Sequence, residues 1–106
     1  MPCNPELERR LTTMNADAAV NALLGGYGGE MLGYLLRVLD DPDDADQAFA
    51  LFREDVRELL ASFGRACSYH AWACNLACRA ARRRRQGEAR RRWRLAGGGA
   101  WALAGR

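Results

Sequence analysis

The chain has 106 residues, of which 49% are hydrophobic and 27% are charged. This length suits one small domain with a modest core and excludes a multi-domain enzyme. Polar or glycine residues interrupt every apolar run well before the roughly 18 to 20 residues that a membrane span needs, and the N-terminus lacks the basic and apolar regions of a signal peptide. We therefore expect a soluble, cytoplasmic chain with no membrane partner.

The net charge of +3 hides an uneven distribution along the chain. Residues 1–60 contain five arginines and twelve carboxylates, a balance of −7, whereas residues 61–106 contain eleven arginines and Glu88 alone, a balance of +10. Every basic residue is arginine, whose planar group forks onto phosphates and guanine edges. An acidic half followed by a basic half indicates two different partners.

The first half of the chain shows apolar residues at helical spacing. A short leading helix is predicted over 5–13, and longer helical pieces over about 16–25 and 29–40. Four glycines between residues 25 and 29 interrupt the pattern, each at a cost of roughly 1 kcal/mol relative to alanine. We therefore expect a kinked or broken helix at these glycines.

The segment Asp41-Pro42-Asp43-Asp44 is the clearest helix start. It combines an aspartate that can cap, a proline at the first helical position and two acids in the first turn. Apolar residues then recur at spacings of three and four, which predicts an amphipathic helix from about Pro42 to near Ser62, stopped by Gly64.

Ser68 is predicted to cap a third major helix. Tyr69, Trp72 and Leu76 belong to its inward stripe, while Asn75, Arg79, Arg82 and Gln86 line an outward face. Residues 89–95 could extend this helix, but the glycine-rich end of the chain has no pattern that fixes a structure.

These patterns predict an all-α fold, a small three- to four-helix bundle, because no strand alternation occurs anywhere. The expected organisation is an N-terminal extension over 1–15, a helical domain over 16–86 and a basic, glycine-rich, flexible tail over 87–106.

Three blocks of sequence, residues 24–39, 41–52 and 63–79, carry a family resemblance. Together they cover roughly residues 20–86 and resemble region 2 of bacterial extracytoplasmic-function sigma factors, the RNA polymerase subunits that recognise and open promoters. The first block is similar to the family's Leu, Tyr-Gly, Leu-x-x-Tyr-Leu pattern, and the second to its acidic helix start. The third shares the family's Phe-to-Ser and Ser-to-Trp spacing, although Gly64-Arg65 inverts the usual Arg-Gly and Arg79 replaces an Asn.

The resemblance implies a transcription initiation factor-like domain with two binding surfaces. Its acidic helix would bind the clamp helices of the largest subunit of RNA polymerase core, through Asp43, Asp44, Asp46, Gln47, Phe49 and Glu54. Its basic helix and the preceding loop would bind the single-stranded −10 element of promoter DNA, through Arg65, Ser68, His70, Trp72, Asn75, Arg79, Arg82, Arg83, Arg84 and Arg85. The resemblance also leaves open an anti-sigma protein as a further partner.

The sequence leaves open two points about the function of the basic residues and about the extent of the protein. The arginines could instead belong to a small helical polyanion-binding or protein-interaction module without promoter specificity, and Trp72 could be a core aromatic rather than a base-stacking one. The family's second module, roughly 50 to 60 residues that read the −35 element, is not found, so a fragment, a truncated product and a free-standing regulator are all compatible with this chain.

No catalytic site, metal site or cofactor is expected. His70, Cys74 and Cys78 share a helix face, but the outer two lie about 12 Å apart, and a smaller set that includes Cys67 would need ligands from a second segment. The four cysteines are expected to be free thiols. His70 is the only histidine and no nucleophile motif accompanies it, so we do not expect an enzyme.

Overall fold

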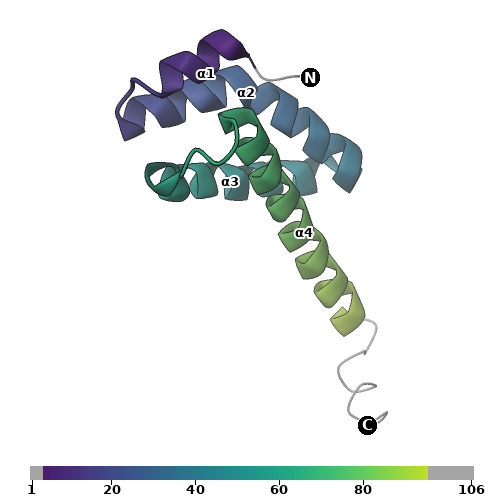
Figure 1. Ribbon diagram of the computed structural model, residues 1–106. Coiled ribbons are helices and arrows are strands. Elements are labelled where there is room, and N and C mark those ends of the chain that lie inside the picture. Colours follow the sequence, from purple (N-terminus) through teal and green to yellow (C-terminus); the bar gives the residue numbers. More distant parts are fainter. Residues whose placement is uncertain (1–3, 96–106) are drawn as a thin grey trace.

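The computed structural model describes residues 4–95, which form four α-helices and one short 3-10 turn. The elements are α1 (Pro5–Leu11), α2 (Ala16–Leu39), α3 (Pro42–Leu59), η1 (Leu60–Ser62) and α4 (Tyr69–Leu95). These residues contain no strand, and the predicted all-α bundle is confirmed (Figure 1).

Among the described residues, no helix is both long enough and apolar enough to span a lipid bilayer.

The helix α2 is continuous from Ala16 to Leu39, so the predicted break at its glycines is wrong. Gly26 lies beneath α1, where an added Cβ would overlap the side chain of Leu7. Gly28 is buried against α3, and its Cβ position lies 3.5 Å from Cζ of Phe49. Glycine therefore lets two neighbouring helices approach α2 closely, and their packing offsets its low helix propensity.

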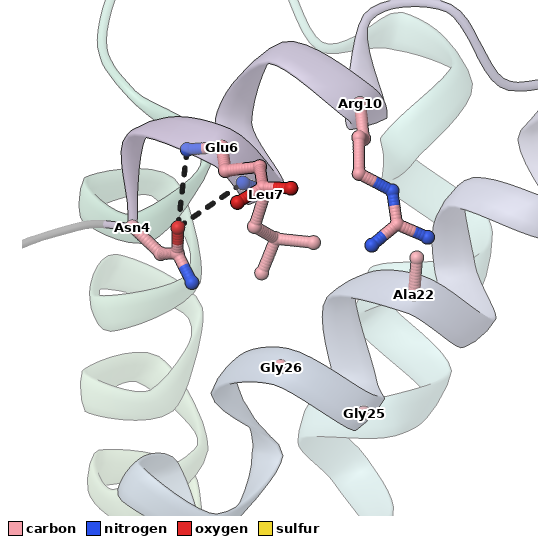
Figure 2. A pocket seen from close by; sticks show the side chains of 7 residues that line it. All are labelled: Asn4, Glu6, Leu7, Arg10, Ala22, Gly25 and Gly26. Carbon is pink, nitrogen blue, oxygen red and sulfur yellow. Dashed lines mark hydrogen bonds between the residues drawn. The ribbon is translucent and has the colours of Figure 1, made fainter.

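A pocket of about 420 Å³ opens beside this contact, between α1 and α2 (Figure 2). Asn4 lines the pocket and caps α1, accepting hydrogen bonds from the backbone N–H groups of Glu6 at 3.1 Å and Leu7 at 3.2 Å. Leu7 and Leu11 are buried, so α1 contributes to the core although it lies within the predicted N-terminal extension.

The start of α3 agrees with the prediction from the Asp-Pro segment. Asp41 accepts from the N–H of Asp43 at 2.9 Å, and Pro42 is the first helical residue. Asp40, between the end of α2 and Asp41, has a φ of 56°, a left-handed conformation that turns the chain sharply between α2 and α3. One 3-10 turn extends the helical path to Ser62, close to the predicted end.

The core lies where α2, α3 and the first half of α4 meet. Leu23, Leu35, Phe52 and Val56 are fully buried there. The face of α4 that packs against this core contains Leu76 and four buried alanines, Ala73, Ala77, Ala80 and Ala81. These alanines allow α4 to lie close against both other helices.

The helix α4 continues to Leu95, past the boundary that we expected at residue 86. Its second half projects beyond the other helices (Figure 1). Arg82, Arg90, Arg94 and Trp93 are exposed along this part. The remaining part of the predicted tail, residues 96–106, lies outside the described residues.

Candidate functional site

The acidic surface of α3 contains most of the residues that we assigned to polymerase binding. Asp43, Asp46, Gln47 and Glu54 are all exposed. Phe49 is partly buried, its ring centroid 5.6 Å from that of Phe52. We refer to the four exposed residues as the acidic surface.

Asp44 does not belong to that surface, because it pairs with α4. Its Oδ1 lies 2.7 Å from Nη2 of Arg84, and the Nε–H of Arg84 donates to the same oxygen at 2.8 Å. Both side chains are more than four-fifths buried, which strengthens the attraction relative to an exposed pair. The Asp44–Arg84 pair therefore ties the first turn of α3 to α4.

Two more of the arginines that the family resemblance assigns to DNA binding make contacts inside the chain. Arg83 donates to Oδ2 of the buried Asp55 at 3.2 Å, and Arg85 donates to the backbone carbonyl of Val38 at 2.9 Å. A guanidinium has five N–H donors, so the half-exposed Arg83 and the exposed Arg85 keep donors for other ligands. Of the four consecutive arginines 82–85, Arg84 has the most buried side chain.

The loop before α4 presents Arg65 to solvent. Arg65 has a φ of 59°, again left-handed, and both it and Cys67 are exposed. The prediction that Ser68 caps α4 is confirmed, because its Oγ accepts a hydrogen bond from the N–H of Ala71 at 3.0 Å. Its hydroxyl therefore has a structural partner within the chain.

Glu8 is a residue that sequence reasoning missed. Its carboxylate accepts from the N–H groups of Tyr69 at 2.8 Å and His70 at 3.0 Å, and from the hydroxyl of Tyr27 at 2.6 Å. A carboxylate suits the positive end of a helix dipole, so Glu8 complements the Ser68 cap. No local pattern indicates this contact, since Glu8 and Tyr69 are 61 residues apart.

An aromatic group packs at the junction of the loop and α4. The ring centroid of Phe63 lies 4.5 Å from that of Tyr69 and 5.3 Å from that of Trp72. Trp72 is partly buried against the core, so it both packs inward and keeps an accessible part. A mainly apolar pocket of about 290 Å³ lies beside this group, and we call it the loop pocket; its lining includes Phe63, Arg65, Cys67 and Tyr69.

Three predicted DNA-binding residues, Asn75, Arg79 and Arg82, are exposed on α4. Their spacing places them on one side of the helix, one to three turns beyond Trp72. We call these three residues the outer row of α4. The outer row, the loop pocket and Arg65 together offer guanidinium, amide and aromatic groups of the kind that bind single-stranded nucleic acid.

His70 does not join the outer row. Its side chain is only 13% exposed, and its Nε2 lies 2.9 Å from Oε2 of Glu30 on α2. The Tyr27 ring meets the imidazole edge to face, with centroids 4.9 Å apart. The structure therefore places His70 between α4 and α2 rather than at the surface assigned to DNA.

Comparison with protein-family models, with curated proteins and with solved structures found no significant match for this chain.

Proposed function

We propose that this chain is a transcription initiation factor-like domain that binds RNA polymerase core through α3 and the single-stranded −10 element of promoter DNA through α4. The observation that carries the proposal is the exposed outer row of α4, on the same helix whose first residue, Tyr69, lines the loop pocket. Single-stranded nucleic acid is bound by aromatic side chains that stack on bases and by exposed arginines that contact phosphates, and the loop pocket and the outer row offer these two kinds of group.

The polymerase half of the proposal is supported by the acidic surface of α3. Asp43, Asp46 and Glu54 remain exposed, whereas the neighbouring carboxylates of Asp44 and Asp55 pair with α4. The chain's own arginines therefore leave a row of negative charge on α3 that a basic partner can contact. The internal pairs also hold the two binding helices in one fixed arrangement.

Polymerase binding is tested by a pull-down with polymerase core and with its clamp fragment. We expect the unmodified chain to bind both, and the double variant Asp43→Lys/Asp46→Lys to lose at least tenfold in affinity because it reverses two exposed charges. Glu6→Lys/Asp17→Lys is the matched control, since it reverses two exposed carboxylates elsewhere. Failure of the unmodified chain to bind core contradicts the proposal.

DNA binding is tested by fluorescence anisotropy with a −10-type single strand and a scrambled strand at equal salt. We expect a preference for the −10-type strand and a loss of tenfold or more in Arg79→Glu/Arg82→Glu, with a shallower dependence on salt. Arg37→Glu/Arg57→Glu removes two exposed arginines of α2 and α3 and serves as the control.

A second candidate function is a polyanion-binding module without promoter specificity. The projecting half of α4 favours it, because Arg90 and Arg94 are exposed beside Trp93, whose side chain is 49% exposed. Such a helix can bind many nucleic acids through charge and stacking alone. Equal affinity for the −10-type and scrambled strands would support this function over the first.

A further inference from the structure

Three side chains with metal-binding atoms converge between α2 and α4. They are Glu30 of α2 and His70 and Cys74 of α4, and no two of their ligand atoms are more than 4.8 Å apart. The Glu30 Oε2 lies 2.9 Å from the His70 Nε2, and the Cys74 Sγ lies 3.9 Å from both ring nitrogens. All three side chains are partly buried and still reachable from solvent.

In the sequence alone, no second segment offers ligands that would complete a zinc site with these α4 side chains. The bundle provides that segment, because α2 crosses α4 and brings Glu30 within reach of His70 and Cys74. His70 and Cys74 are four residues apart, so they lie one turn apart on the same side of α4. Cys78, one turn further, is engaged elsewhere, since its Sγ is 3.3 Å from the hydroxyl of Tyr34 in a hydrogen bond.

The distances suit a four-coordinate ion. Ligand bonds of about 2.0 to 2.3 Å at tetrahedral angles separate an oxygen from a nitrogen by about 3.3 Å and a nitrogen from a sulfur by about 3.6 Å. The observed 2.9 Å and 3.9 Å differ from these values by a few tenths of an ångström. The Glu30 oxygen and the Cys74 sulfur lie within 4.8 Å of each other, and side-chain rotation would have to bring them to about 3.5 Å on a shared ion. A cation would take the place of the proton between Nε2 and Oε2.

The surroundings position His70 without help from a metal. Glu8 accepts from its backbone N–H at 3.0 Å, and the Tyr27 ring packs against its imidazole. The pKa of the Cys74 thiol is raised by burial and then by the nearby Glu30 charge, and the charge of a bound cation would act in the opposite direction by favouring the thiolate.

We propose that Glu30, His70 and Cys74 form a Zn²⁺ site that joins α2 to the first turns of α4. A thiolate, an imidazole and a carboxylate match the ligand preference of Zn²⁺, whereas Mg²⁺ and Ca²⁺ prefer oxygen ligands alone. Three protein ligands leave a fourth position for water or for a ligand from another molecule. The site is independent of the proposed function, because it uses neither the acidic surface nor the outer row of α4.

The test is a titration of the full reduced chain with Co²⁺ followed by absorption spectroscopy. Tetrahedral Co²⁺ bound by a thiolate gives visible bands and a near-ultraviolet charge-transfer band. We expect both in the unmodified chain, together with their loss when Zn²⁺ is added in competition. Cys74→Ser should abolish the charge-transfer band, and Glu30→Gln should weaken Co²⁺ binding at least tenfold.

The control is a variant in which Cys74 is the sole thiol, Cys3→Ser/Cys67→Ser/Cys78→Ser, and it should keep the charge-transfer band. Absence of the band in the unmodified chain, or its survival in Cys74→Ser, overturns the proposal. Circular dichroism of each variant checks that its helices are intact. A second readout is the thermal midpoint, which Zn²⁺ should raise in the unmodified chain and not in Cys74→Ser.

Discussion

The two halves of α4 belong to one helix and are stabilised in different ways. Residues 69–81 carry the buried alanines and Leu76, and Glu8 and Ser68 cap their first turn. Residues 82–95 begin with arginines that contact α2 and α3 and then project from the bundle, where Arg90, Arg94 and Trp93 are exposed. The first half is helical because it packs, whereas the outermost turns depend on helix propensity, which alone gives marginal stability in water.

The charged contacts follow the same division. At the N-terminal end of α4, carboxylates of α1 and α2 reach the helix, and each finds a backbone or imidazole partner. In the middle, Arg83 and Arg84 return to α3 as ion pairs. Further along, Arg90 and Arg94 are exposed, so the projecting end presents positive charge to solvent.

The largest difference between the halves should come from removing apolar side chains. Leu76→Ala removes a side chain that is 2% exposed, and we expect it to lower the free energy of unfolding by about 2 to 4 kcal/mol. Trp93→Ala should change it by less than about 0.5 kcal/mol despite the larger side chain. Urea denaturation measures both, and equal effects would show that the two halves are packed alike.

The cap at the first turn of α4 should have the next largest effect. Glu8→Ala removes the acceptor of three hydrogen bonds, and we expect a loss of about 2 kcal/mol. Glu6→Ala removes an exposed carboxylate of the same helix and should cost less than about 1 kcal/mol. The comparison of their thermal midpoints isolates the contact between α1 and α4 from helix propensity.

The ion pairs in the middle of α4 should contribute less. Asp55→Asn removes the charge opposite the half-exposed Arg83, and we expect a loss of about 1 kcal/mol in chemical denaturation. Its neighbour Glu54 is exposed, so Glu54→Gln should stay within about 0.5 kcal/mol of the unmodified chain. If Glu54→Gln lowered the free energy of unfolding more than this, the stabilisation would come from the net charge of α3 rather than from the Asp55–Arg83 pair.

The smallest expected change concerns Gly87, in the projecting half. Apart from its two chain neighbours, no side chain among the described residues lies within 4 Å of its Cβ position, so Gly87→Ala gains helix propensity without a clash, up to about 1 kcal/mol locally. We expect slower amide hydrogen exchange around residue 87 and an unchanged midpoint of global unfolding. A raised midpoint would mean that both halves of α4 unfold together.

The helix boundaries that sequence predicted well are those with local causes. Asp41 and Ser68 cap their helices through atoms two or three residues away, so their sequence context was sufficient. The glycines of α2 misled the prediction because their cost is local, whereas the packing that offsets it comes from Leu7 and Phe49 on other helices.

The candidate sites divide in the same way. The exposed charges of α3 and the outer row of α4 follow from helical periodicity, and periodicity can be counted along the chain. The α4 partners of Asp44, Glu8 and Glu30 lie 40 to 62 positions away, and no spacing rule connects them. Arg84 and His70 consequently lie in internal contacts, although the family resemblance implied that both bind DNA.

Amino-acid order alone therefore accounts for the all-α class, the start of α3, the cap of α4 and the separation of acidic from basic charge, since each depends on neighbours within a few turns. Tertiary structure decided the continuity of α2, the choice of arginines that remain exposed and the meeting of Glu30, His70 and Cys74. These features depend on how closely helices approach one another, which is set by packing across the core.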